Sequence, residues 1–229
     1  MSDIIKLLPD AVANQIAAGE VIQRPASAVK ELLENAIDAG ADNISLVIND
    51  AGKAVIQVID NGCGMSETDA RMCFERHATS KIKYAKDLFS IRTMGFRGEA
   101  VPSIASVSKL RIATQEQEAV EGTEIIIDGG VVKDVRLTGM QSGSVFEIKN
   151  LFFNVPARRK FMRTESTESA HVEHQVKLHA LAYPEVRFTF KKDGRIVFDV
   201  PGTSDRRTRI AGLSGNDIGK ALIEVPHTE

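Results

Sequence analysis

The clearest hydrophobic period in the chain lies in residues 24–40. Five apolar residues recur there at helical spacing, namely Val29, Leu32, Leu33, Ala36 and Ile37. This spacing places them on one face of a helix, which a folded domain buries against its core. Pro25 suits the first turn of such a helix, and Gly40 suits its end. The pattern therefore predicts an amphipathic helix.

Most of the other apolar stretches have the length and composition of strands. Residues 44–48 and 54–59 flank a turn-like segment and predict a β-hairpin. Further strands are expected at residues 124–127, 131–137, 144–148, 186–191 and 196–200. Two Asp-Gly pairs, at 128–129 and 193–194, are typical of hairpin turns and join two pairs of these strands.

Two more helices and one long irregular segment complete this pattern. Helices are expected at residues 66–74 and at 171–183, where Pro184 ends the second one. Residues 76–103 are rich in Gly, Ser, Thr and charge. Loops longer than ~12–15 residues are uncommon in compact domains, so this segment predicts a functional lid. The order of elements favours an α+β fold, a two-layer sandwich of a mainly antiparallel, mixed sheet covered by helices.

Composition excludes two protein classes. Of the 229 residues, 43% are hydrophobic and 26% are charged, which is ordinary for a globular protein and excludes disorder. No apolar run approaches the ~18–20 residues of a membrane span, and the first ten residues lack the pattern of a signal peptide. Cys63 and Cys73 match neither a disulfide framework nor a metal site. We therefore expect a cytosolic protein with free thiols and no membrane partner.

The net charge of -2 does not indicate a chain dominated by nucleic-acid binding. Any contact with DNA must come from local basic clusters, and two are present, at residues 157–163 and 206–209. Charge runs of this kind are more often only solvated.

A change of composition near residues 202–209 is typical of a linker. We expect one domain over residues 1–203, and over residues 204–229 a linker and the truncated start of a second domain. The last ~20 residues are too few to bury a core of their own.

Three polar residues of the first helix are candidates for chemistry. Glu31, Asn35 and Asp38 stand at i, i+4 and i+7, so they share a stripe opposite the apolar face. A stripe of this kind is, by itself, more typical of a solvated helix surface than of a site.

Residues 60–64, with the sequence Asp-Asn-Gly-Cys-Gly, follow directly after a predicted strand. The carboxylate of Asp60 can accept a hydrogen bond from an exocyclic amine, and Gly62 and Gly64 let the backbone approach a flat ring. Asn-Gly is also a strong turn signal, so this segment alone supports a plain turn equally well.

Two loop segments have features of phosphate binding. Residues 95–100, Gly-Phe-Arg-Gly-Glu-Ala, lead into a helix-like run, and free backbone N–H groups before a helix favour anions. Residues 76–81 add hydroxyls and cations, with Lys81 as a point charge. A solvated loop explains either segment alone.

Taken together, these segments resemble the GHKL ATPase superfamily, which includes DNA gyrase, an Hsp-type chaperone, histidine kinases and MutL. Within it they are similar to the MutL family in particular. The matching strings, in order, are ANQIAAGEVIQRPASAVKELLENAIDAGA at 13–41, DNGCGM at 60–65, RHATSKI at 76–82, GFRGEA at 95–100 and LFFNVPARRKFM at 151–162.

The resemblance implies a role for each matching residue. It implies that Glu31 is the general base and acts on the metal only through water, that Asn35 is a ligand of Mg²⁺, and that Asp60 reads adenine. The other residues it places around ATP are Asp38, Gly62, Gly64, Met65, Thr79, Ser80, Lys81, Gly95, Phe96, Arg97, Gly98, Glu99, Ala100 and Ser144. Ser144 stands where the family often has threonine. Pro102 departs from the family pattern, but it falls in the first turn of the expected helix, where a missing N–H costs little.

The resemblance also implies a GHKL (Bergerat) fold and a Mg-dependent ATPase domain of DNA mismatch repair. Such a domain acts as a nucleotide-driven switch for homodimerisation, non-specific DNA association and signalling to other repair proteins, and in a bacterium it is associated with the nucleoid. The family also uses a lysine of its second domain on the terminal phosphate. Two alternatives stay open: a nucleotide-gated module without hydrolysis, and a type II topoisomerase ATPase domain, which the strings at 13–41 and 151–162 disfavour.

Overall fold

A computed structural model describes residues 6–91 and 93–223. Within them lies an eight-stranded sheet in the order β5-β4-β3-β6-β2-β1-β7-β8. The strands are β1 Asn43–Asn49, β2 Val55–Asp60, β3 Lys109–Gln115, β4 Gly122–Asp128, β5 Val131–Thr138, β6 Gly143–Lys149, β7 Arg187–Lys192 and β8 Arg195–Val200. Neighbouring strands are antiparallel except for the parallel pair β1 and β7. The predicted mixed sheet is thus confirmed.

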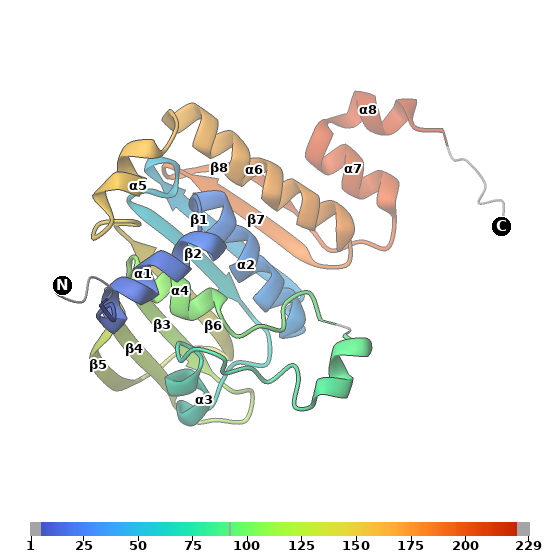
Figure 1. Cartoon of the computed structure of the whole chain (residues 1–229). Coiled ribbons are helices and arrows are strands. Elements are labelled where there is room, and N and C mark those ends of the chain that lie inside the picture. Colours follow the sequence, from blue (N-terminus) through green and yellow to red (C-terminus); the bar gives the residue numbers. More distant parts are fainter. Residues whose placement is uncertain (1–5, 92, 224–229) are drawn as a thin grey trace.

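Helices α1, α2, α4 and α6 cover one face of this sheet (Figure 1). The helices are α1 Asp10–Val21, α2 Pro25–Asp38, α3 Glu67–Met72, α4 Ala100–Ser106, α5 Pro156–Phe161, α6 Glu165–Ala182, α7 Arg206–Ser214 and α8 Asn216–Ala221. Two short 3-10 helices, η1 Asp50–Gly52 and η2 Ala85–Phe89, lie in connections. Across the described residues, none of the helices has the length and apolar character needed to cross a bilayer.

The core lies between the helical layer and the sheet, as the hydrophobic pattern predicts. Val29, Leu32 and Leu33 of α2 are fully or almost fully buried, and so are alternate residues of β1. Because α2 buries its apolar face on the sheet, its opposite stripe faces away from the core. The fold therefore presents Glu31, Asn35 and Asp38 at the outer side of this layer.

The lid is shorter than the sequence indicates, because α4 already begins at Ala100 and the irregular segment ends at Glu99. The expectation of a loop through residue 103 is wrong, since the apolar run 101–107 packs as a helix in the core. Pro102 is the third residue of α4, in the first turn as expected. The last helix of the main fold, α6, begins at Glu165 rather than at residue 171, because Thr164 caps it through the Thr167 amide.

The sequence did not predict strand β3 or the helices α1, α5, α7 and α8. Helix α1 is rich in Ala and lacks an apolar stripe, yet it packs on α4. Strand β3 alternates apolar residues but directly follows a helix, which hides its start. Helix α5 is basic and has no buried residue among its six.

The segment that the sequence marks as a linker contains helix α7, which packs on α6 and β8. Arg209 is only 2% exposed, and its Nη2 lies 2.5–2.9 Å from the carbonyl oxygens of Pro184, Val186 and Pro201. Arg209 thus attaches α7 to the edge of the main fold. Its buried guanidinium does not contribute an exposed charge to the basic cluster at 206–209. The division at residue 203 stays a prediction, and residues 224–229 of the expected second part lie outside the described residues.

Replacement of Arg209 by methionine is expected to lower the free energy of unfolding by about 2–4 kcal/mol. Hydrogen bonds to a charged donor contribute ~1.5–3 kcal/mol. Three carbonyl oxygens, of which that of Val186 is in a buried hydrogen bond, would lose this partner. The shift of the urea midpoint measures this loss. Arg206→Met, on the exposed side of the same helix, is the control with an expected change within about 0.5 kcal/mol. Equal midpoints for the two variants would contradict the fastening role.

Candidate functional site

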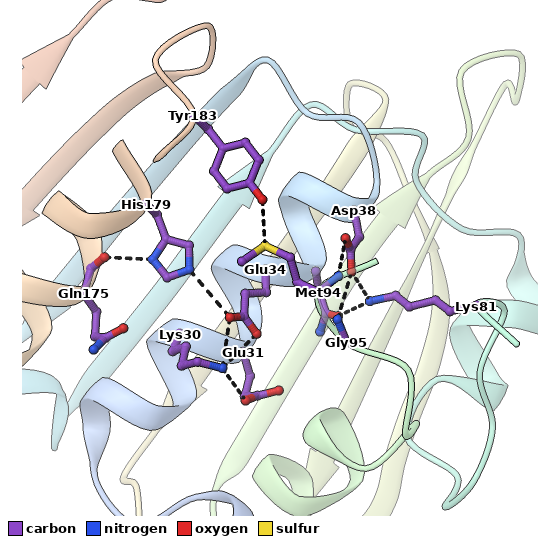
Figure 2. A network of polar contacts seen from close by, with 11 residues as sticks. Lys30, Glu31, Glu34, Asp38, Lys81, Met94, Gly95, Gln175, His179 and Tyr183 are labelled. Atoms are coloured by element: carbon purple, nitrogen blue, oxygen red, sulfur yellow. Dashed lines mark hydrogen bonds and ion pairs between the residues drawn. The ribbon is translucent and has the colours of Figure 1, made fainter. Parts of the chain in front are cut away.

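The polar stripe of α2 forms the centre of the candidate site. The Nζ atom of Lys81 donates to Asn35 Oδ1 at 3.0 Å and to Asp38 Oδ2 at 2.6 Å (Figure 2). Both residues bond the same ammonium, so the i and i+3 positions face one point, as the helical spacing predicts. The Asp38 side chain is only 9% exposed, so solvent screens this pair weakly.

Asp38 also binds the far end of the lid (residues 76–91 and 93–99). The backbone amides of Met94 and Gly95 donate to its two carboxylate oxygens at 3.1 and 3.4 Å. The Tyr183 hydroxyl, just after α6, donates to Met94 Sδ at 3.2 Å. Asp38 therefore contacts both the beginning of the lid, through Lys81, and its end.

Glu31 lies one turn before Asn35 and belongs to a separate polar chain (Figure 2). Lys30 Nζ lies 3.3 Å from Glu31 and 2.9 Å from Glu34, whose carboxylate is 3.9 Å from Nε2 of the buried His179. Burial lowers the pKa of Lys30, but its hydrogen bond to Glu34 and the charges of Glu31 and Glu34 outweigh this and raise the pKa above its ordinary value. Glu31 is 27% exposed, so water reaches its carboxylate.

Asp60 marks a second, buried part of the site, at the end of β2. Its Oδ1 accepts from the Gly62 amide at 2.9 Å, and β2 pairs it with Ser144 of β6. Burial raises the pKa of Asp60, and hydrogen bonds from the amides of Gly62 and Ser144 act in the opposite direction. A buried carboxylate with free acceptor capacity can bind an amine donor.

Thr114 of β3 is a residue of this region that the sequence did not reveal. Its buried hydroxyl accepts from the Met65 amide at 2.9 Å and lies 3.1 Å from the Gly143 carbonyl oxygen and 3.0 Å from Ser144 Oγ. It therefore joins Met65 and Ser144, two residues that the resemblance places around ATP. A threonine in a strand has no sequence signal for such a role, because strands favour threonine in general.

The two parts of the site are joined through the loop after β2. The Cys63 amide donates to the Ala39 carbonyl oxygen at 2.9 Å, directly after α2. Gly62 packs against Ala39 so closely that a Cβ would lie 2.8 Å from the alanine Cβ. Gly64 has φ +68°, and a side chain there would overlap the Gln115 carbonyl. Gly62 thus allows the loop after Asp60 to approach the end of α2, and Gly64 allows it to approach β3.

The remaining predicted residues lie along the lid. Gly98 has φ +62° and packs against the Ala78 carbonyl, which brings the 95–100 segment beside the 76–81 segment. Thr79 Oγ1 accepts from the Lys81 amide at 3.2 Å. Arg97 is exposed and lies over the Phe96 ring at 5.8 Å. Ser80 is exposed, Glu99 and Ala100 are half-buried, and Glu99 lies 3.5 Å from His77.

Among the described residues, no group of three or more His, Cys, Asp or Glu side chains could hold a metal ion.

Thr114→Val is expected to weaken adenine-nucleotide binding about tenfold, while Thr114→Ser stays near the parent. Valine keeps the shape but leaves the Met65 amide without its acceptor, and an unmet buried group costs ~1–3 kcal/mol. Calorimetric titration with ATP in both variants measures the difference. Equal affinities in the valine and serine variants would show that the hydroxyl does not organise this pocket.

Comparison with known proteins agrees with this fold. Residues 23–136 match the family described as histidine kinase-, DNA gyrase B- and HSP90-like ATPase. The DNA mismatch repair protein MutL of Bacteroides fragilis is 54% identical over 98% of this chain and 36% of its own length. The MutL of Akkermansia muciniphila is 50% identical over 98% of this chain and 35% of its own length. The chain thus spans about a third of these curated relatives.

Solved structures give the same result. The MutL ATPase domain of Aquifex aeolicus, complexed with ADP, is 33% identical, with a TM-score of 0.68 over 84% of this chain and 69% of that one. The N-terminal domain of a DNA repair protein is 25% identical, with a TM-score of 0.76 over 89% of this chain and 60% of that one. On sequence and fold together, this chain belongs to the MutL family of DNA mismatch repair proteins and is an ATPase domain of the GHKL type.

Proposed function

We propose that the chain binds ATP with the adenine at Asp60 and the triphosphate over α2, and that Glu31 acts as general base in its hydrolysis. One observation carries this proposal: the loop that holds Asp60 is bonded to Ala39, at the end of the helix that presents Glu31 and Asn35. The loop beside the proposed adenine-binding carboxylate and the helix proposed to face the phosphates are therefore bonded directly to each other. The ADP in the related Aquifex aeolicus structure supports a nucleotide at this fold.

The Asp60 carboxylate gives this site a reason to prefer adenine. An ionised carboxylate only accepts hydrogen bonds, and adenine presents an exocyclic amine where guanine presents a carbonyl oxygen. Asp60 is only 7% exposed. A guanine carbonyl oxygen facing its carboxylate would therefore leave both acceptors without a hydrogen bond, because water could not replace the missing donor. Thr114 and Ser144 fix the surrounding strand ends.

The residues of the α2 stripe fit a magnesium ion. Asn35 offers an amide oxygen and Asp38 a carboxylate, which are ligands that Mg²⁺ prefers, and the Lys81 ammonium between them is a stand-in cation. Mg²⁺ in proteins uses one or two such ligands together with phosphate oxygens, so no larger cluster of acids is required. When bound, the ion would neutralise charge that develops on the phosphates. Asn35 would hold it.

Glu31 is placed to orient a water molecule and to accept its proton. It stands one turn from Asn35 on the same stripe, so both side chains reach the same side of the triphosphate. Lys30 bonds Glu31 and Glu34 together, which limits the rotamers of Glu31. The lid would close over the phosphates with Thr79, Ser80 and Arg97 and exclude other water.

Steady ATP turnover, measured on this chain beside a version extended through the second domain, tests this function. We expect ATP binding in both and faster turnover in the extended version, because the family resemblance implies a phosphate-contacting lysine there. Binding with no turnover in either version would support the second candidate, a nucleotide-gated interaction module. Absence of adenine-nucleotide binding in both would contradict the proposal.

We further propose that nucleotide binding orders the lid and drives homodimerisation, DNA association and signalling to other repair proteins, and that hydrolysis resets the switch. Exposed apolar residues of the N-terminal region, Leu7 and Ile16, support an interface there. Exposed Arg159 and Lys160 of α5 support a non-specific DNA contact. Arg158 does not, because its guanidinium packs against Gly19 of α1.

Replacement of both Arg159 and Lys160 by alanine is expected to weaken DNA binding at low salt and to reduce the salt slope by about 2. Each lost phosphate contact removes ~0.9 from the slope of log K against log salt. Fluorescence anisotropy with duplex DNA at several salt concentrations measures both quantities. A double variant with equal charge change, Lys133→Ala with Arg195→Ala, is the control on exposed strand positions. Equal slopes in both double variants would remove α5 from the DNA contact.

A further inference from the structure

A cation already stands at the proposed metal position. Lys81 Nζ lies 3.0 Å from Asn35 Oδ1 and 2.6 Å from Asp38 Oδ2, the two oxygens that fit Mg²⁺. The lysine side chain is 19% exposed and that of Asp38 is 9% exposed. A lysine of a solvated loop usually keeps its ammonium in water. Here the ammonium has exchanged water for two protein oxygens.

The surroundings of this ammonium make room for it. Gly95 lies beside Lys81, and a Cβ at that position would come 3.4 Å from Nζ. The amides of Met94 and Gly95 also donate to Asp38, so the carboxylate accepts three hydrogen bonds from the lid, one of them from Lys81. One positive charge balances the one negative charge of Asp38, and the neutral Asn35 is held by the same donor.

We propose that the Lys81 ammonium is a built-in counter-ion, which occupies the cation position between Asn35 and Asp38 in the nucleotide-free protein and leaves Asn35 when magnesium-nucleotide binds. The inference rests on the proposed magnesium site at Asn35. It makes Lys81 a positioning residue whose ammonium competes with the metal for one ligand. Asp38 then anchors the lid through the amides of Met94 and Gly95.

Release of Lys81 has different consequences for the two ends of the lid. The end at Met94 and Gly95 keeps its bonds to Asp38, because these amides do not depend on the lysine. The beginning of the lid loses the hydrogen bond from Lys81 to Asn35 on α2. Metal entry and lid rearrangement are thus one coupled event.

The inference makes a specific statement about magnesium. Without Mg²⁺, the ammonium can stay in place and partly neutralise a bound triphosphate; with Mg²⁺, it must be displaced. Loss of the ammonium therefore weakens nucleotide binding without the metal and removes a competitor when the metal is present. Both effects increase the gain in affinity that Mg²⁺ gives. A lysine that only fastens a loop would leave this gain unchanged.

The test uses Lys81→Met, which keeps the length of the side chain and removes its charge. The dissociation constant of a non-hydrolysable ATP analogue is measured with Mg²⁺ and with EDTA, and the ratio of the two constants is the magnesium gain. We expect this gain to be about fivefold larger in Lys81→Met than in the parent. A fivefold change corresponds to the free energy that a well-placed, partly exposed ion pair contributes. Asp38→Asn, which keeps an acceptor for the Met94 amide, should also increase it. Lys83→Met, an exposed lysine of the same lid, should not.

Hydrogen exchange of the nucleotide-free protein is the second readout. Amides at the beginning of the lid, residues 76–84, should exchange faster in Lys81→Met than in the parent. Their exchange rates in Lys83→Met should equal those of the parent. A parent protein that binds the analogue with no magnesium gain would overturn the proposed metal site, and with it this inference. A clear gain that is equal in the parent and in Lys81→Met would overturn the counter-ion alone. Unchanged exchange in Lys81→Met would show that the ammonium does not hold the lid.

Discussion

Replacement of Glu31 by alanine is expected to lower ATP turnover by roughly 10²–10⁴-fold while ATP binding stays within about a factor of three. This is the usual contribution of a positioned general base. Glu31 lies apart from Asp60, and among the described residues its carboxylate bonds Lys30. Its loss therefore removes neither the adenine contact nor the lid bonds to Asp38. A loss in kcat without a loss in affinity marks an interaction used only in the transition state.

Single-turnover kinetics and calorimetry on the same samples separate these two quantities. Turnover is measured both in this chain and in the version extended through the second domain, because hydrolysis is expected to be faster there. Glu173→Ala is the matched control, since Glu173 forms an exposed ion pair with Lys177 on α6. If Glu31→Ala turns over ATP as fast as Glu173→Ala, another group is the base.

Asp60→Asn is expected to weaken ATP binding by about 10–100-fold and GTP binding much less. The variant keeps an oxygen for the Gly62 amide, so the loop can remain in place. It replaces a charged acceptor in a buried pocket, and hydrogen bonds to charged groups contribute ~1.5–3 kcal/mol. Competition titrations with ATP and GTP give the preference. A variant that retains the adenine preference of the parent would exclude Asp60 as the reader.

The raised pKa of Asp60 adds a pH dependence to this result. Burial disfavours the charged carboxylate, so the side chain becomes protonated at a higher pH than an exposed aspartate. Because the pKa of Asp60 lies above the ordinary value of an aspartate, adenine binding that needs the ionised form is lost at a higher pH than that value as pH falls. Asp60→Asn has no such group, and its weaker affinity should not show this step.

The sequence predicted the parts of the fold that short-range patterns determine. The apolar face of α2 and the hairpin of β1 and β2 follow helical and strand periodicity, and the structure has both. Helix α1 could not be predicted in this way, since an Ala-rich segment becomes a helix here through its packing on α4. Arg209 is the opposite case: it looks like a solvated cation, but carbonyl groups from distant residues bury it.

The candidate site shows the same limit. Asp60 and Glu31 were proposed because they belong to recognisable strings, while Thr114 was missed because its three partners come from other segments. Lys81 was proposed as a lid residue for the same reason as Asp60 and Glu31. Its position against Asp38 depends on the path of a long loop, which no local pattern specifies. Roles that depend on contacts between segments require the structure.

The central claim is that the loop of Asp60 and the stripe of α2 form one adenine-nucleotide site. A crystal structure of this chain with Mg²⁺ and a non-hydrolysable ATP analogue tests it most directly. The account predicts the adenine amine at hydrogen-bond distance from Asp60, the ion at Asn35 Oδ1, and a water molecule between Glu31 and the terminal phosphate. An analogue bound with its base away from Asp60, or with its phosphates away from α2, would contradict it.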